Sequence, residues 1–133
     1  MMSEDKTQII ELLKTSNKKP TVIRNHSKDG FFVDKTLYQH SIIIDTFSVR
    51  KWNLKSTKIR ESDFEFLNKL DSYPELVLLG VGNIIEEPFF TIRSKMSKLS
   101  ISIEIMTTSA ACRTWNVLLS EGRNSLACIK HEY

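Results

Sequence analysis

The pattern of hydrophobic and polar residues changes character near residue 62. Before that point, from Thr21 to about Asn53, short runs of β-branched and aromatic residues are separated by turn residues, which predicts strands. The expected strands are TVIRNH, FFVD after a turn at Asp29 and Gly30, YQHSIIIDTF, and VRKWNL. YQHSIIIDTF alternates poorly in its middle, which indicates a strand buried on both faces. The short connections predict antiparallel neighbours, that is, an N-terminal β-meander.

After residue 62 the apolar residues recur with helical spacing between apolar runs. SDFEFLNKL predicts a helix with a capping box formed by Ser62 and Glu65. The continuous apolar run in PELVLLGVG predicts a central parallel strand. Pro88 is expected in the first turn of the next helix. That helix carries its apolar stripe at Phe89, Ile92, Met96 and Leu99.

The C-terminal third predicts one more helix between two strands. SISIEIM alternates strictly, which is typical of a half-exposed or edge strand. A helix is expected from about Ser109 to Glu121, with Gly122 ending it, and NSLACI is the last strand. The second half therefore reads strand, helix, strand, helix, strand, a β-α-β-α-β parallel unit with right-handed crossovers. The predicted class is mixed α/β, with helices on one face of a sheet and more β-structure packed elsewhere.

Length and composition describe an ordinary globular chain. A chain of 133 residues suits a single domain, here residues 20–133, preceded by a helical or flexible appendage over residues 1–19. The net charge of +3 is too balanced for a nucleic-acid partner, and the basic stretch from Lys51 to Arg60 is interpreted as a solvated loop. The apolar runs are too short to insert into a membrane.

Cysteine and histidine usage gives no sign of a metal or cofactor. Cys112 and Cys128 form no CxxC pair and have no histidine at ligand spacing, so free thiols in a reducing compartment are expected. The N-terminus carries acids early and lacks an adjacent hydrophobic stretch, unlike a secretory signal or a transit peptide. A cytoplasmic location in a bacterial source is expected, or the mitochondrial matrix if the source is eukaryotic.

Two strand ends are candidates for binding chemistry, because ligands gather beyond the carboxyl ends of parallel strands. The first is GVGN, where Gly80 and Gly82 allow a tight turn beside Asn83. Ile85 occupies the position of the third glycine of a dinucleotide fingerprint, and no Gly-Lys-Ser/Thr follows as in a phosphate loop. On the glycines alone, a simple strand-to-loop turn is the favoured interpretation.

The second candidate is the start of the last helix, MTTSAACRTWN. Thr107, Thr108 or Ser109 can cap this helix, whose free amide groups then favour an anion, a carboxylate or an acidic side chain of a partner. Cys112 lies near the first turn, where the pKa of a thiol can fall. Further donors come from Arg113, Thr114 and Asn116.

The alternative is that these residues serve packing and surface pairing. Cys112 has helical spacing with Trp115 and is interpreted as a core residue rather than a nucleophile, since no nearby histidine would activate it. Arg113 could pair with Glu121 instead of a ligand. Binding and structural roles for Arg113 and Asn116 are equally supported at this stage.

PELVLLGVGN, the proline-started helix and ISIEIMTTSAACRTWNVLLSEGR together resemble one family. It is the family of small α/β domains that includes a mitochondrial respiratory complex I (NADH dehydrogenase) assembly factor, with bacterial and archaeal members of unknown function. The GFFVDKTLYQHSIII hairpin and Trp52 also fit, so the resemblance covers roughly residues 20–130. Family members often carry Asp where this chain has Thr107, which keeps capping ability but loses a charge.

The resemblance implies a three-layer β/β/α fold without an established cofactor or catalytic residues. It implies a surface cleft at the matching positions, which are Gly80, Gly82, Thr108, Ala111, Cys112, Thr114, Asn116, Gly122 and Arg123. With the residues reached above, the candidate cleft comprises Gly80, Gly82, Asn83, Thr107, Thr108, Cys112, Arg113, Thr114, Asn116 and Arg123.

Two functions follow as hypotheses. The first is a non-enzymatic binding or assembly protein whose partners are proteins, with respiratory-complex subunits as candidates and homo-oligomerisation left open. The second is a small-molecule or anion-binding protein, or an enzyme, that uses the strand-end cleft around Gly80–Asn83 and Thr107–Asn116. The first is preferred.

Overall fold

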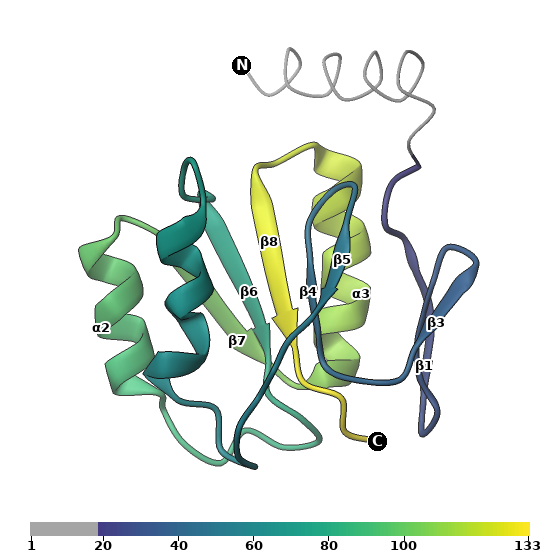
Figure 1. The fold of residues 1–133 in the computed structure, drawn as a ribbon, viewed down its shortest axis with the longest axis horizontal. Helices are drawn as coiled ribbons and strands as arrows, with labels where there is room; N and C mark the ends of the chain where they lie inside the picture. The colour runs from purple at the N-terminus through teal and green to yellow at the C-terminus, as the bar shows by residue number, and fades with distance from the viewer. Residues whose placement is uncertain (1–18) are drawn as a thin grey trace.

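The computed structural model describes residues 19–133, which form two sheets with helices packed against them (Figure 1). The predicted appendage over residues 1–19 lies outside the described residues except for Lys19. The elements in chain order are β1 (Ile23–Ser27), β2 (Gly30–Val33), β3 (Thr36–Tyr38), β4 (Ile42–Ile44), β5 (Val49–Lys51), the 3₁₀ helix η1 (Glu61–Lys69), β6 (Leu76–Gly80), α2 (Phe90–Lys98), β7 (Ser102–Met106), α3 (Thr108–Glu121) and β8 (Ser125–Ile129).

The small sheet, with antiparallel order β1-β2-β3, is the first part of the predicted meander. The last part, β4 and β5, is also antiparallel but belongs to the large sheet. The large sheet has the order β5-β4-β8-β6-β7, in which β6 runs parallel to both β7 and β8. Two crossover helices, α2 and α3, connect these three parallel strands, as the C-terminal β-α-β-α-β pattern predicted. The mixed α/β class with an N-terminal meander is therefore confirmed.

Burial explains why the apolar runs became the central strands. All five residues of β6 and all five of β8 are buried, because each strand has a neighbour on both sides and side chains packed on both faces. The alternating segment became β7, which lies at the edge of the sheet and exposes Ser102 and Glu104. Both predictions from periodicity are correct.

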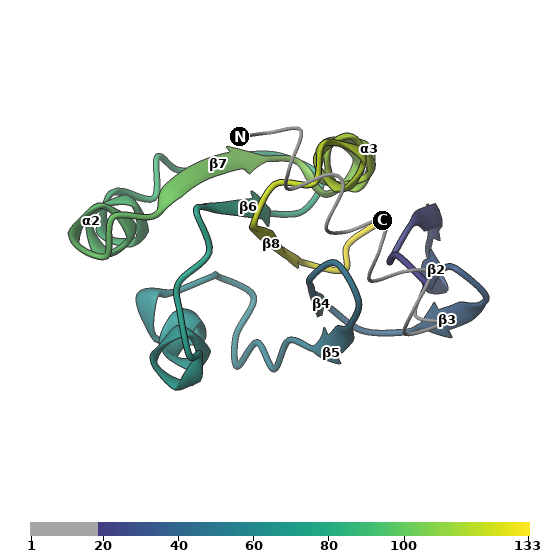
Figure 2. The same ribbon diagram turned by 90° about the horizontal axis from the view of Figure 1, so that it is seen from above.

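Two hydrophobic cores lie on opposite faces of the large sheet (Figure 2). One core joins η1 and α2 to the sheet through residues such as Phe64, Leu67 and Met96. The other joins α3 and the small sheet to the opposite face, with Trp115 and Phe31 at its centre. The helices thus cover both faces, whereas the sequence predicted them on one face. The continuous apolar runs of the central strands show that both faces of the sheet are covered, but they do not say which helix covers which face.

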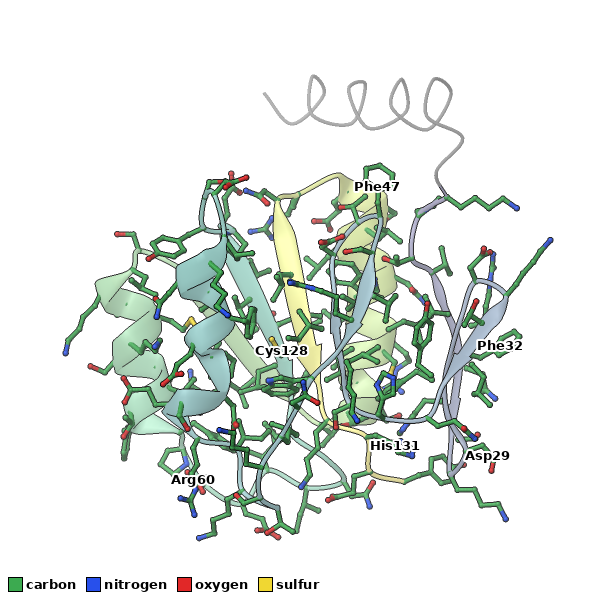
Figure 3. All side chains as sticks on the ribbon, in the orientation of Figure 1. Asp29, Phe32, Phe47, Arg60, Cys128 and His131 are labelled. Carbon is green, nitrogen blue, oxygen red and sulfur yellow. The ribbon has the colours of Figure 1, made fainter. Side chains whose placement is uncertain are left out.

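Side chains at the two sheets differ sharply in exposure (Figure 3). Cys128 on β8 is fully buried among the side chains between sheet and helices, whereas Phe32 on β2 is 40% exposed and points away from the core. The exposed face of the small sheet is therefore the one turned away from α3.

Three local predictions need correction. YQHSIIIDTF is not one strand: residues 39–41 carry the chain from β3 in the small sheet to β4 in the large sheet. The capping box of Ser62 and Glu65 is wrong, since the helix begins at Glu61 and the Asp63 carboxylate accepts a 2.8 Å bond from the amide of Arg60.

Pro88 precedes α2 instead of occupying its first turn. Phe89 is the N-cap, with φ of 56°, and its ring is buried while Phe90 at the first helical position is 76% exposed. Burying the Phe89 ring requires the chain to turn sharply there, which places a bulky residue in a costly left-handed conformation.

Candidate functional site

The start of α3 is held in place by two threonines with different roles. Thr107 is the N-cap, and its hydroxyl accepts a bond from the amide of Ala110. Thr108 is 1% exposed; its hydroxyl accepts a 2.9 Å bond from the Gly82 amide and donates a 2.6 Å bond to the Lys130 carbonyl. Thr108 therefore ties α3 to the ends of β6 and β8.

The same contacts use up most of the amides at this helix end. The Thr108 amide donates to the Gly82 carbonyl at 2.8 Å, and the Ala110 amide is taken by the cap. The expectation that several free amides point towards a ligand is therefore wrong, because the strand ends and the cap satisfy them.

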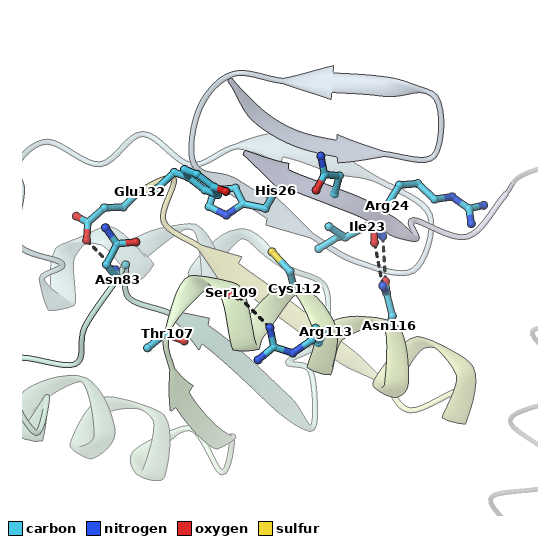
Figure 4. Close-up of a pocket in the computed structure, with 13 residues that line it drawn as sticks. Ile23, Arg24, His26, Asn83, Thr107, Ser109, Cys112, Arg113, Asn116 and Glu132 are labelled. Atoms are coloured by element: carbon cyan, nitrogen blue, oxygen red, sulfur yellow. Dashed lines mark hydrogen bonds between the residues drawn. The ribbon is translucent and has the colours of Figure 1, made fainter. Parts of the chain in front are cut away.

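The sequence candidates divide between a cleft and the structure beneath it. A cavity of about 540 Å³ opens between α3, β1, the loop after β6 and the C-terminal residues (Figure 4). Six of the ten candidates line it: Gly82, Asn83, Thr107, Cys112, Arg113 and Asn116.

The remaining four candidates do not line this cavity. Gly80 is buried where α3 approaches β6, and a Cβ there would come within 2.9 Å of the Ala111 Cβ. Thr108 is the joint described above, and Thr114 lies on α3 away from the cavity. Arg123 follows the opposite end of α3, and 14 helical residues span roughly 20 Å. Gly122, with φ of 69°, serves to end the helix.

About half of the residues that line the cavity were not among the ten candidates named from the sequence. The missing residues are Ile23, Arg24, Asn25 and His26 from β1, Ser109, and Glu132 and Tyr133 from the C-terminal end. The β1 residues lie about ninety residues before α3 in the chain, so nothing in the α3 segment points to them. Ser109 lies on α3 itself, where the sequence indicates it only as a possible cap, and Glu132 and Tyr133 reach the cleft only through the fold.

Asn116 is a structural clamp rather than a free donor. Its Oδ1 accepts from the Ile23 amide at 2.9 Å, and its Nδ2 donates to the Ile23 carbonyl at 2.9 Å. One helical position earlier, the Trp115 indole N–H donates to the Thr21 carbonyl at 2.9 Å. Together these side chains fix the start of β1 against α3.

Arg113 is exposed and held on its own helix. Its Nη1 donates to the Ser109 hydroxyl at 2.9 Å, so the alternative pairing with Glu121 does not occur. Arg24 on the opposite wall is also exposed. Within residues 19–133 the recorded salt bridge joins Lys130 to Glu132, at 3.1 Å, and neither arginine takes part in it.

The titratable groups of the cleft respond to their surroundings in opposite directions. Burial raises the pKa of the Cys112 thiol to about 12, and the charge of Arg113 offsets this only in part. Cys112 is the fifth residue of α3 and lies beyond its first turn. The expected lowering of its thiol pKa does not occur, and the thiol is protonated at neutral pH. The Asn83 amide, which donates to the Glu132 carboxylate at 2.7 Å, and the Lys130 ammonium lower the pKa of Glu132.

A pair of histidines lies at the cleft, of which His26 lines the cavity. His26 Nε2 lies 3.2 Å from His131 Nδ1, and the His26 ring stacks on Phe31. Burial, together with the nearby His131, lowers the pKa of His26. His131 Nε2 lies 3.2 Å from the Lys28 carbonyl, so His131 donates there and accepts from His26.

Residues 19–133 lack two other kinds of feature. They contain no group of three or more His, Cys, Asp or Glu side chains placed to hold a metal ion. None of their helices has both the length and the apolar character needed to cross a bilayer.

Residues 23–129 match the family model described as "Protein of unknown function (DUF498/DUF598)", a span that includes both walls formed by β1 and α3. The chain belongs to this family. Family membership accounts for the resemblance carried by the strand-to-helix segment around Thr107.

Curated relatives carry two kinds of name. The chain is 28% identical over 111 residues to the "13 kDa major membrane protein" of Francisella tularensis subsp. holarctica (strain LVS), covering 83% of this chain and 89% of that one. It is 29% identical over 115 residues to the mouse "NADH dehydrogenase [ubiquinone] 1 alpha subcomplex assembly factor 3". That match covers 86% of this chain but 62% of the mouse protein.

Solved structures share the fold. A protein of Bartonella henselae described as an outer membrane protein aligns with a TM-score of 0.73 at 26% identity, covering 86% of this chain and 97% of that one. A "Mth938-like domain" of Bordetella pertussis aligns with a TM-score of 0.66 at 20% identity, covering 84% and 85%. The second likeness shows the fold alone.

Proposed function

We propose that this chain is a non-enzymatic binding protein that takes part in assembling a larger protein complex, with respiratory complex I subunits as its partners where the cell has that complex. The observation that carries the proposal is the match over 86% of the chain to a relative named as a complex I assembly factor. A cytoplasmic location, or the matrix in a eukaryote, is part of the proposal.

The geometry of the cleft supports binding rather than catalysis. Cys112, which would be its nucleophile, is 8% exposed and protonated at neutral pH. Asn116 is fully engaged with Ile23. Within residues 19–133, the exposed arginines Arg24 and Arg113 on the two walls of the cleft form no salt bridge and can contact a partner.

The test is quantitative co-purification from the source organism. Tagged wild type, the double variant Arg24→Ala/Arg113→Ala and the control Val117→Ala are compared by mass spectrometry. Val117 is exposed on α3 but does not line the cleft. Respiratory complex subunits are expected with wild type and control, and at least about tenfold less with the double variant. If these subunits are absent from the wild-type sample, the assembly function is refuted.

A small anionic ligand is the second candidate, because the cavity of about 540 Å³ lies within the usual range for small-molecule sites. The positive charges of Arg24 and Arg113 in the cavity lining favour an anion. Thermal-shift screening of small carboxylates and phosphates tests this. A stabilisation that Arg113→Ala abolishes would favour the ligand, and a flat response to the whole set would exclude it.

A further inference from the structure

Among residues 19–133, no strand pairs with the edge of β1 that faces the cleft. β1 is the first strand of the order β1-β2-β3, and within residues 19–133 it pairs with β2 on its other side. Four successive residues, Ile23 to His26, line the cavity. Unpaired edge strands present backbone donors and acceptors that an extended chain can use.

Asn116 already occupies the first position along this edge in the manner of a neighbouring strand. Its side-chain amide donates one hydrogen bond to the backbone of Ile23 and accepts another from it, both at 2.9 Å. A β-strand neighbour makes the same pair of bonds with its own N–H and C=O. Past Ile23, no side chain among the described residues is recorded in this role for Arg24, Asn25 or His26.

The register of the small sheet is interrupted at the same point. Between Ile23 and Asn25 the β1–β2 pairing shifts, and Arg24 has no partner on β2. Such bulges redirect side chains and are frequent beside functional sites. Here the bulged residue is an exposed arginine that lines the cleft from β1, while the exposed Arg113 lines it from α3 and points towards Ser109 (Figure 4).

The charges of the cleft lining select the kind of chain that fits. Arg24 and Arg113 form no recorded salt bridge within residues 19–133, whereas the carboxylate of the lining, Glu132, is held by Lys130 and the Asn83 amide. An incoming segment therefore meets two unpaired positive charges and an already neutralised negative one. Acidic side chains complement this arrangement.

We propose that the cleft accepts an extended, acidic segment of a protein partner, which pairs with the free edge of β1 as an added strand. This inference rests on the proposed function, since it names the part of the partner that binds. Asn116 marks one end of the pairing, and the C-terminal residues Glu132 and Tyr133 bound the other. At about 3.3 Å per residue, an edge as short as β1 pairs with three or four residues of the partner.

The experiment is NMR titration of the ¹⁵N-labelled full chain with three defined peptides. The probe is Ac-Val-Glu-Val-Glu-Val-NH₂, which favours an extended conformation. One control replaces each Glu with Lys, and the other is the acidic peptide with every backbone amide N-methylated. Saturable shifts of the β1 amides from Arg24 to His26 are expected with the acidic probe, and at least about tenfold weaker binding with either control.

Charge-reversal variants test the role of the arginines. Arg24→Glu and Arg113→Glu are each expected to weaken binding of the acidic peptide at least about tenfold. Lys98→Glu on α2, outside the cleft, should leave the affinity for this peptide unchanged. The inference is overturned if the acidic probe causes no shift, or if the Lys peptide or the N-methylated peptide binds equally well. Either result leaves the co-purification of respiratory subunits unaffected, so the two proposals fail separately.

Discussion

Replacing Asn116 with alanine removes both bonds to the backbone of Ile23 and leaves one amide and one carbonyl without partners. Ile23 is 5% exposed and belongs to the core that joins β1 to α3. Water in the adjacent cleft can reach part of the vacated space. The loss of stability is therefore smaller than for two fully buried backbone groups that have no hydrogen-bond partner.

The size of the effect follows from these two bonds. A net contribution of about 1 kcal/mol for each bond gives a loss of about 2 kcal/mol in the free energy of unfolding. For a chain of this length that corresponds to a Tm lower by about 8 °C. Val117→Ala, at the next position on α3 with a 56% exposed side chain, should stay within about 0.5 kcal/mol.

The variant Asn116→Asp distinguishes the contribution of the accepted hydrogen bond from that of the donated one. A carboxylate still accepts from the Ile23 amide, but its second oxygen faces the Ile23 carbonyl and cannot donate. Protonation of the carboxyl supplies an O–H donor, so the destabilisation relative to wild type should shrink as pH falls from 8 towards 4. Stability that depends on a protonated carboxyl is present at low pH and lost as pH rises.

Urea unfolding followed by the fluorescence of Trp52 and Trp115 measures these differences, since both indoles are buried. Hydrogen exchange of the Ile23 amide supplies a local readout, and the exchange rate should rise in Asn116→Ala. The reasoning is refuted if Asn116→Ala unfolds at the same urea concentration as Val117→Ala.

Three further predictions concern other parts of the cleft. Iodoacetamide should modify Cys112 in the folded protein at pH 7.4 at least about a hundredfold more slowly than in urea, because the pKa of the thiol is raised to about 12 in the fold. Mass spectrometry measures the two rates, and equal rates would show an accessible thiolate. Gly82→Ala should lower the free energy of unfolding by about 1–3 kcal/mol, because Gly82 has φ of +114° and the new Cβ would lie 2.5 Å from the Glu132 carboxylate. Urea unfolding measures the change, and an unchanged midpoint would contradict the expected backbone strain. Wild-type stability should fall between pH 7.5 and 5.5 and fall less in His26→Phe. The pKa of His26 is lowered in the fold, so the unfolded chain takes up the proton first and the stabilisation present above the ordinary histidine pKa is lost on acidification; parallel profiles for the two proteins would exclude His26 as the source.

The sequence itself predicted those features that depend on neighbours along the chain. For α3 the sequence limited the cap to Thr107, Thr108 or Ser109 and predicted the end at Gly122. The structure has the cap at Thr107 and the end at Gly122. The burial of β6 and the edge position of β7 follow from a continuous run and an alternating run respectively. In each case the physical cause, a cap, a turn or a buried face, acts over a few residues.

The roles of individual cleft residues depended on tertiary structure. Asn116 becomes a clamp only because Ile23, 93 residues earlier, lies beside it. The pKa of Cys112 rises although the sequence allowed a lower value near a helix start, because burial of the thiol outweighs the charge of Arg113. The sequence alone determined the chemistry of each side chain and the hydrophobic periodicity that defines the helices and strands. The hydrogen-bond partners, the burial and the charge balance of the cleft residues were decided only when β1 and the C-terminal residues packed against α3.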